Sequence, residues 1–366
     1  MNLPAFEHFL CNPEQLQTRI AQIDPRAYDK TRNYLDGEVT WLSPFVTHGV
    51  ISTQSIANTV LAQHEAKACY RLLFELGWRE FFHRTWQLNG ENIFRDIRHP
   101  QTQVLSSEVS KAIVNSSTGI QVIDECLDAL TTHGVMHNHA RMWIASLSCN
   151  IAGTHWQEPA RWLHYHLLDG DLASNTLSWQ WIAGTFSHKK YLANQNNIDK
   201  YSNSEQRNSW LDISYEDFEQ FTPPEHLLVR CKVDYCHEIP TGMPIRPLKG
   251  AVALRSLWQL DPEWQKNIDQ HIIFVDTDLN HRWPMSPLRW RFIEHWAKYC
   301  NAPIFYGTID QLQKACADAK VIRAEYPACE HWPGVECERD WLYPLPDNPF
   351  NSFSQYFKQV KHHVGL

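Results

Sequence analysis

Apolar positions recur at helical spacing through roughly the first 200 residues of the chain. Five segments carry this period: 51–66, 70–87, 120–132, 136–153 and 160–168. Start signals support two of the helices, because Ser43 precedes a proline and Thr118-Gly119 precedes a turn that contains Asp124 and Glu125. The pattern predicts a helical domain over residues 1–205.

The pattern changes beyond this domain. Residues 202–224 are polar and acidic and contain a proline pair, which is typical of a linker. Strand-like runs then alternate with helical ones. Strands are predicted at 227–231, 271–276, 303–307 and 320–325, and helices at 252–260, 287–299 and 309–319. Such alternation predicts a small α/β domain with a parallel sheet over residues 225–345, followed by a C-terminal tail, 346–366, without a clear assignment. The predicted fold is therefore mainly α, with a small α/β domain after the helical one.

The composition of the chain narrows the range of functions that it could have. The chain has 366 residues and a formal net charge of −8, so a nucleic-acid partner would need a local basic groove. Its ten cysteines include no CxxC pair, which favours buried thiols over a metal site. The start, MNLPAFEHFL, lacks the features of a signal peptide, and no apolar run approaches the ~18 residues of a membrane span. We therefore expect a cytoplasmic protein with no metal and no membrane contact, of unknown oligomeric state.

The helical domain contains four segments with unusual polar residues. Ser43 at a helix start fits either an anion site or an ordinary capped helix. Asp171, Asn175 and Trp179 share a helical face, which fits a ligand site better than a plain N-cap does. Arg141 lies in an apolar helix, where it either pairs with Asp169 or reaches solvent along its stem.

The fourth segment is ELGWREFF. Glu75, Trp78 and Arg79 fall at positions i, i+3 and i+4, so an acid, a ring and a base share one face. A half-exposed helix with an internal ion pair explains this spacing equally well.

Together these segments resemble the FAD-binding helical domain of DNA photolyases and cryptochromes. The motifs are YDKTR, WLSP, ELGWREFF, TGIQVID, MHNHARM and DGDLASNTLSWQW, and the resemblance covers about residues 28–200. It implies FAD as the cofactor. The cofactor-binding residues that it implies are Tyr28, Arg32, Thr40, Leu42, Ser43, Arg79, Asn138, Arg141, Asp169, Asp171 and Asn175.

The resemblance also implies roles for these residues. Those from Tyr28 to Ser43 would hold the phosphates and ribitol, and Arg79 would lie over the cofactor. The Arg141–Asp169 pair and Asp171 would lie beside the flavin ring. Asn175 would face flavin N5, an arrangement that favours a fully reduced anionic flavin.

The activity implied is that of a deoxyribodipyrimidine photolyase. The catalytic residues implied are Trp179, Trp156, Asn175, Asn138 and Glu75, with Trp179 and Trp156 as inner and middle members of an electron relay. The pocket for a flipped cyclobutane pyrimidine dimer would be lined by Glu75, Trp78, Asn138, Met142 and Trp181. The partner would be DNA that contains such dimers. The alternative is a cryptochrome-like blue-light photoreceptor that binds FAD without repairing DNA.

Departures from the family pattern affect the relay and the DNA contacts. Gln103 stands near the place of the outermost relay tryptophan, so photoreduction would either use another exit, such as Trp162 or Tyr165, or be slow. His139 replaces an arginine that commonly contacts phosphate, which favours single-stranded DNA. Lys189 and Lys190 either compensate or form a solvated face.

The usual N-terminal α/β antenna domain has no room before Tyr28. The α/β pattern beyond residue 227 is either a displaced antenna-like domain or convergent patterning. A region 227–325 without a parallel sheet would exclude the displacement.

Overall fold

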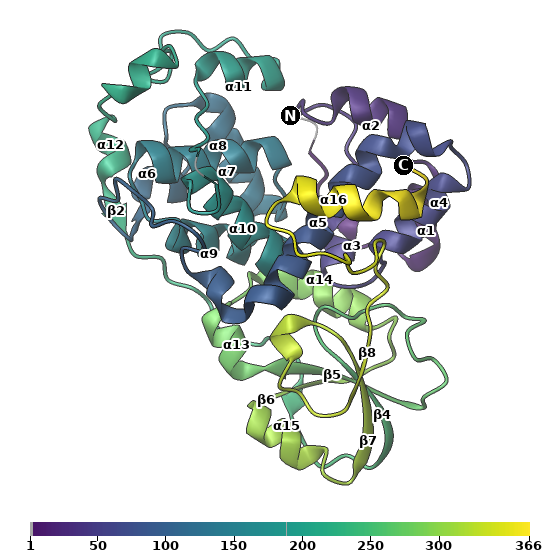
Figure 1. Cartoon of the computed structure of the whole chain (residues 1–366). Coiled ribbons are helices and arrows are strands. Elements are labelled where there is room, and N and C mark those ends of the chain that lie inside the picture. The colour runs from purple at the N-terminus through teal and green to yellow at the C-terminus, as the bar shows by residue number, and fades with distance from the viewer. Residues whose placement is uncertain (1–2, 188) are drawn as a thin grey trace. The chain divides into compact units, whose positions relative to one another are not determined.

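The computed structural model describes residues 3–187 and 189–366, and within these no helix is long and apolar enough to cross a membrane. The chain forms two compact units (Figure 1). Unit 1 combines the residues up to Phe6 with Arg26–Val39 and Phe82–Asp234. Unit 2 combines Glu7–Pro25, Thr40–Phe81 and Tyr235–Leu366. The boundary falls inside the long helix α5, Ala66–Asn89.

Unit 1 is helical. Its helices are α2 (Pro25–Thr31, from Arg26), the end of α5, α6 (Lys111–Val114), α7 (Gln121–His133), α8 (Asn138–Ser146), α9 (Gln157–His166), α10 (Leu172–Ala183), α11 (Gln195–Ser202) and α12 (Glu225–Leu228). A π-helical turn, Leu147–Ile151, continues α8, and the short strands β1 (Val109–Ser110) and β2 (Arg230–Cys231) pair antiparallel. The buried core contains four tryptophans, Trp143, Trp156, Trp162 and Trp179.

Local signals in the sequence explain the ends of α7. In the first turn of the helix, Asp124 accepts hydrogen bonds from two residues that precede the helix, from Thr118 N at 2.8 Å and from Gly119 N at 3.2 Å. At its C-terminal end, Gly134 adopts a left-handed conformation with φ of 72°, which glycine accommodates without steric cost. The predicted start at Thr118-Gly119 is confirmed.

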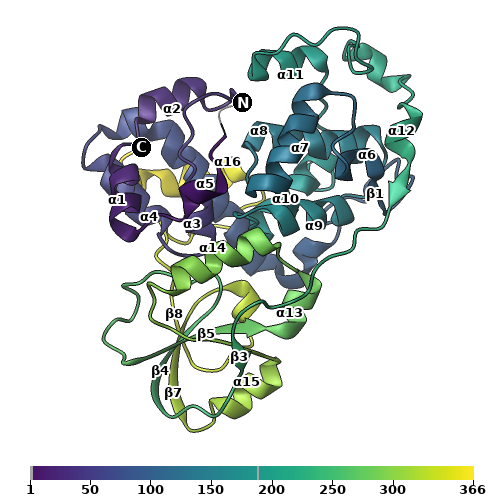
Figure 2. The same cartoon turned by 180° about the vertical axis from the view of Figure 1, so that it is seen from behind.

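Unit 2 contains a six-stranded sheet in which every pair is parallel (Figure 2). Its order is β3 (Met243–Pro244), β6 (Ile304–Gly307), β5 (Gln270–Asp276), β4 (Gly250–Arg255), β7 (Ala319–Ala324) and β8 (Val335–Cys337). The helices of unit 2 are α1 (Pro13–Ala21), α3 (Ser43–Thr47), α4 (Thr53–Leu61), the first part of α5, α13 (Thr277–Arg282), α14 (Pro287–Ala297), α15 (Ile309–Ala315) and α16 (Phe353–Val360). The predicted parallel sheet is confirmed.

Three local predictions were wrong. Residues 227–231 were expected to form a strand of the α/β domain, but α12 extends to Leu228, and the two-residue β2 that follows pairs antiparallel with β1 in unit 1. Residues 252–260 were expected to be helical, but the structure places strand β4 there, between β5 and β7. A strand buried on both faces reads as an unbroken apolar run, which periodicity cannot distinguish from a buried helix. Ser43 begins the five-residue α3 but does not cap it, because the N-cap position belongs to Leu42 and no side chain bonds there.

The C-terminal tail is ordered on α5. Phe357 and Tyr343 lie so close to Gly77 that a Cβ atom there would meet their rings at 3.2 Å. The buried Glu80 carboxylate accepts from Leu342 N at 2.7 Å and Tyr343 N at 2.9 Å. Both figures show α16 beside α5.

The two units divide the chain differently from the predicted domains, because segments before residue 82 pack with the sheet region. The segment expected to be a linker packs within unit 1, where Leu211 is buried and Trp210 Nε1 donates to Thr118 O at 2.8 Å. The boundaries 1–205, 225–345 and 346–366 stay a prediction.

Candidate functional site

The structure joins Arg141 of α8 to Asp169 in the turn before α10. One guanidinium nitrogen of Arg141 lies 2.9 Å from each carboxylate oxygen of Asp169, and Arg141 Nε donates to Met136 O at 3.0 Å. Asp169 is almost fully buried, whereas 24% of the arginine side chain stays exposed. A buried carboxylate needs such a partner, so this pair fixes the first turn of α8 against the turn that precedes α10.

Asp171 lies two residues further on, as the N-cap of α10. One of its oxygens accepts from Ser174 N at 2.7 Å, and the other lies 2.8 Å from His83 Nε2. Asp171 and His83 are 2% and 3% exposed, so this contact is shielded from solvent. Sequence reasoning missed His83, although a histidine four residues after Arg79 in an apolar helix was a usable signal.

Asn175 and Trp179 follow on α10. Asn175 is half-buried and donates from Nδ2 to Ala160 O at 2.9 Å, which leaves its amide oxygen available to a ligand. Trp179 is 2% exposed and belongs to the core of unit 1. The Asn175 amide and the Trp179 ring thus lie on α10, and the Asp171 carboxylate lies at its N-cap.

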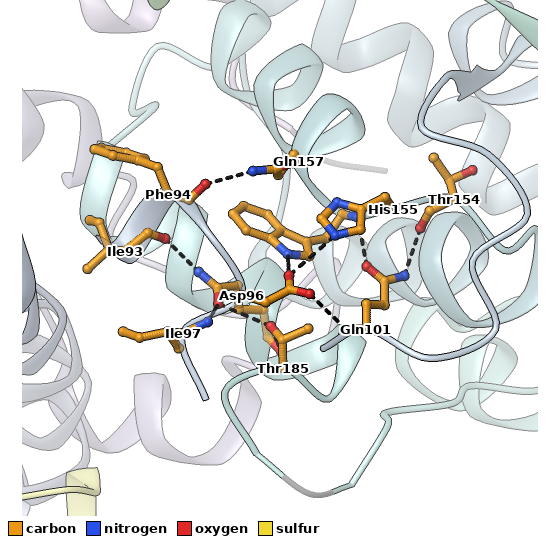
Figure 3. Close-up of polar contacts among 11 residues, drawn as sticks. Ile93, Phe94, Asp96, Ile97, Gln101, Thr154, His155, Gln157 and Thr185 are labelled. Atoms are coloured by element: carbon orange, nitrogen blue, oxygen red, sulfur yellow. Dashed lines mark hydrogen bonds and ion pairs between the residues drawn. The ribbon is translucent and has the colours of Figure 1, made fainter. Parts of the chain in front are cut away.

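Trp156 begins a polar network that the sequence did not reveal. Its indole Nε1 donates to Asp96 Oδ1 at 2.7 Å, and His155 Nε2 lies 3.3 Å from the same oxygen. Figure 3 shows Asp96 and Gln101 within this network of hydrogen bonds. Asp96 lies sixty positions away in the sequence, so no local spacing could have predicted it.

The remaining cofactor candidates are divided between the units. In unit 2, Thr40 Oγ1 accepts from the backbone N–H of the buried Leu42 at 3.4 Å, Ser43 is exposed, and Arg79 donates to Thr47 Oγ1 at 3.3 Å. In unit 1, Tyr28 is half-buried, and Arg32 donates to Asp29 O at 3.0 Å. Within unit 2, Trp41 has φ of 51°, a conformation that is a genuine outlier for a bulky residue.

The substrate candidates of unit 2 are already in contact with protein groups. Trp78 stacks on Phe353 of α16 with a centroid distance of 3.9 Å and an interplanar angle of 14°. Glu75 forms a 4.0 Å ion pair with Arg71, one turn earlier on α5. The face of the Trp78 ring that meets Phe353 is therefore occupied.

The substrate candidates of unit 1 are more exposed to solvent. Asn138 is exposed as the first residue of α8, and Met142 is half-buried against the core. Trp181 is 39% exposed, and its ring lies 6.1 Å from that of Tyr191.

The residues that depart from the family pattern are also placed. Burial, followed by the charge of Arg32, lowers the pKa of His139 to about 4, so this side chain is neutral at pH 7 and offers no charge to a phosphate. Lys190 Nζ donates to Gln103 Oε1 at 2.8 Å, whereas Lys189 is exposed.

The two alternative exits for an electron, Trp162 and Tyr165, are both buried. His166 lies against the two rings, at centroid distances of 5.1 Å and 4.9 Å.

Comparison with known proteins identifies the central segment. Residues 72–211 match the family model of the FAD binding domain of DNA photolyase. The resemblance predicted from the motifs is confirmed. FAD is the cofactor of this segment, and the residues that could hold its flavin ring (Arg141, Asp169, Asp171 and Asn175) fall inside the matched range.

Relatives of both functional classes are similar to this chain. A cryptochrome DASH of Vibrio parahaemolyticus is 30% identical over 168 residues, which is 43% of this chain and 38% of that protein. A deoxyribodipyrimidine photo-lyase of Streptomyces griseus is 30% identical over 161 residues, 43% of this chain and 35% of that protein. The solved structure of a Synechocystis cryptochrome has a TM-score of 0.45 and 23% identity, over 55% of this chain and 44% of that one. The chain thus spans less than half the length of these relatives.

The donors in unit 1 fit a flavin ring. The ring's polar edge carries an N–H that needs an acceptor and carbonyl oxygens that need donors. The Asp171 carboxylate is of the type that could supply the acceptor, and the partly exposed Arg141 and the Asn175 amide could supply polar contacts from neighbouring elements. The described residues contain no group of three or more His, Cys, Asp or Glu side chains that could hold a metal ion.

Proposed function

We propose that the protein is a light-driven DNA repair enzyme that splits cyclobutane pyrimidine dimers. Reduced FAD, excited by blue light, supplies the electron that opens the dimer ring and recovers it afterwards. The observation that carries this proposal is the buried Arg141–Asp169 pair beside the Asp171–His83 pair, both inside the segment that matches a photolyase FAD-binding domain.

In this proposal the chain's own residues orient the cofactor and keep water away from it. Arg141 is held by Met136 O and Asp169, and Asp171 is held by His83. These two side chains contact the polar edge of the flavin ring. Asn175, whose amide nitrogen is bonded to Ala160 O, would turn its amide oxygen toward flavin N5. Trp179 and Trp156, both buried in one core, pass electrons toward the ring. Among the remaining candidates, Tyr28, Arg32, Thr40, Leu42 and Ser43 hold the phosphates and ribitol, Arg79 lies over the cofactor, and Asn138 contacts it too.

The proposed substrate is a dimer turned out of the strand. Trp78 and Trp181 supply aromatic walls, and Glu75, Asn138 and Met142 supply edges, because a flipped base is recognised by stacking and by polar groups. A neutral His139 weakens the contact with a duplex backbone, which supports a preference for single-stranded DNA.

A second candidate is a blue-light photoreceptor that binds FAD without repairing DNA. One observation favours it: Phe353 already covers one face of Trp78, so a dimer can stack there only after α16 moves away. The two candidates therefore differ in whether α16 leaves α5 when damaged DNA binds.

The parallel sheet of unit 2 supports a third element of the proposal, a displaced antenna-like domain. A parallel sheet with helical crossovers is the architecture that such a domain requires. A second chromophore that co-purifies with the chain and transfers excitation to FAD would support this assignment, and energy transfer that is absent in every preparation would contradict it.

The test of the repair proposal is illumination of the reduced protein with a thymine-dimer oligonucleotide. Repair should occur in the wild type and be lost when Trp78→Ala and Trp181→Ala are combined, with FAD content unchanged. The control is Tyr215→Ala, which removes a ring that is 49% exposed and lies outside the predicted pocket. Repair that survives the double substitution would overturn the assigned pocket, and wild type that binds the oligonucleotide but leaves it intact would favour the photoreceptor.

A further inference from the structure

The hydrogen bond between Trp156 and Asp96 links a buried indole to a carboxylate near solvent. Trp156 is 1% exposed, and its N–H donates to Asp96 Oδ1 across 2.7 Å. About a quarter of the Asp96 and His155 side chains is exposed, and His155 Nε2 lies 3.3 Å from the same Asp96 oxygen. The three groups therefore form a short path from the core of unit 1 to water.

The carboxylate is held in a fixed orientation. Gln101 N donates to Asp96 Oδ2 at 2.8 Å, and Gln101 Oε1 accepts from Trp156 N at 2.9 Å. Gln101 thus forms hydrogen bonds with both Asp96 and Trp156 (Figure 3).

The loop that carries Asp96 is also pinned to α10. The buried Gln180, next to Trp179, donates to Ile93 O at 2.6 Å and accepts from Ile97 N at 3.0 Å. The same helix therefore carries the inner tryptophan of the proposed relay and positions the carboxylate that binds the middle one.

A buried indole N–H usually finds an acceptor, but the acceptor need not be charged. Trp143 Nε1 donates to the amide oxygen of Asn197 at 3.1 Å, and Trp210 Nε1 donates to the carbonyl of Thr118 at 2.8 Å. Neutral acceptors satisfy these two indoles, whereas Trp156 alone of the three meets a carboxylate, which can also accept the proton itself.

We propose that Asp96 takes up the indole proton of Trp156 when Trp156 is oxidised, an inference that rests on the proposed electron relay. One electron leaves Trp156, by way of Trp179, for light-excited FAD, which is the oxidant. The radical cation left on Trp156 is a much stronger acid than the neutral indole, so its N–H bond breaks and an O–H bond forms at Asp96 Oδ1. Trp156 is then a neutral radical and Asp96 a carboxylic acid, and the proton passes on to His155 Nε2 or to water.

This proton transfer makes the charge separation last longer. Return of the electron to Trp156 would require the proton to come back as well, which slows recombination and gives an external reductant time to act. Proton transfer to Asp96 suits a relay in which Gln103 stands near the expected place of the outermost tryptophan. Trp156, the middle tryptophan, must then stay oxidised for longer.

The test compares the wild type with three variants by transient absorption, which separates the cation radical from the neutral radical of tryptophan by their different bands. In wild type the neutral radical should form with a solvent deuterium isotope effect. Asp96→Asn keeps an oxygen that can accept the N–H but cannot take a strong acid's proton, so radical deprotonation should slow on the order of 100-fold, the lower range for a positioned proton acceptor. Asp96→Glu should restore it in part. Asp128→Asn, the same charge change at an exposed position of α7, should behave as wild type.

An indole ¹⁵N–¹H spectrum of the FAD-free protein provides an independent readout. The Trp156 signal, assigned by its loss in Trp156→Phe, should lie downfield in wild type and move upfield in Asp96→Ala but not in Asp128→Asn. An unmoved signal would show that the hydrogen bond is not formed and would overturn the proposal.

The two proposals fail in different ways. If Trp156→Phe leaves the tryptophan radical unchanged, the relay is wrong and Asp96 has no proton to accept. Suppose instead that Trp156→Phe abolishes the radical, but that the Trp156 radical in Asp96→Asn loses its proton as fast as in wild type and with the same isotope effect. The relay then stands, and the role of Asp96 is refuted.

Discussion

Replacing Phe353 by alanine should release the C-terminal helix from α5. The Phe353 side chain is 4% exposed. Its ring centroid lies 3.9 Å from that of Trp78, 4.8 Å from that of Phe74 and 5.3 Å from that of Phe357. Truncating a buried phenylalanine costs about 3–5 kcal/mol in a protein core. An isolated helix of the length of α16 is unstable in water, so most of this loss should appear as local opening of the tail.

Limited trypsin digestion measures that opening. Lys358 lies on the exposed side of α16, and cleavage there requires the helix to detach. A loss of about 3 kcal/mol in opening free energy should raise the cleavage rate on the order of 100-fold when opening is fast relative to cleavage. Leu345→Ala is the control, because this side chain lies just before the tail and is 63% exposed, so the variant should be cleaved at the wild-type rate.

The same variant separates the two functional candidates. If Trp78 walls a dimer pocket, exposing its ring should raise the affinity for a dimer oligonucleotide in Phe353→Ala. Cleavage of Phe353→Ala at the wild-type rate, with an unchanged unfolding curve, would refute the conclusion that this ring holds the tail on α5.

Four further outcomes are expected. Asp169→Asn leaves the partly exposed guanidinium of Arg141 without its carboxylate, so the free energy of unfolding should fall by about 1–3 kcal/mol and FAD retention should drop, which urea unfolding and the visible spectrum would detect. Glu80→Gln replaces an acceptor of backbone N–H groups and should lower the free energy of unfolding by about 2 kcal/mol. Burial lowers the pKa of His137 and His139 to about 4 from about 6.5, so unfolding takes up protons between these values and stability should fall as pH decreases from about 6.5 to 4. Trp179→Phe should slow FAD photoreduction sharply because phenylalanine is a far poorer electron donor; unchanged kinetics would place the relay elsewhere.

Local chemistry in the sequence was sufficient for helices α5, α7, α8 and α9 and for one ion pair, whereas the short helices α2, α6, α11 and α12 were not predicted. The helix after Thr118 is set by its acidic first turn and its terminal glycine, both of which act on neighbouring backbone. The pairing of Arg141 with Asp169 could be anticipated because an arginine in an apolar helix needs a carboxylate. The alternative, an arginine extended into solvent, was equally open from the sequence and is settled by the 2.9 Å contacts.

Features that depend on distant parts of the chain were missed. His83, Asp96 and Glu80 find their partners 88, 60 and 262 positions away, and no spacing rule reaches that far. Helix α16 did carry a readable signal, since Phe353, Tyr356, Phe357 and Val360 fall at i, i+3, i+4 and i+7. The prolines that precede this helix hid the pattern. Strand β4 was misread because burial on both faces removes the alternation that marks a half-exposed strand.

The most direct test of the central claim is light-dependent repair by the reduced, FAD-containing protein. A single-stranded oligonucleotide with one thymine dimer, illuminated with blue light, should regain two intact thymines, and the dark control should not. Affinity for this oligonucleotide should fall with rising salt, because any contact with phosphate releases counterions. A fully reduced protein that binds the oligonucleotide and leaves the dimer intact under light would contradict the repair function, although FAD binding would still stand.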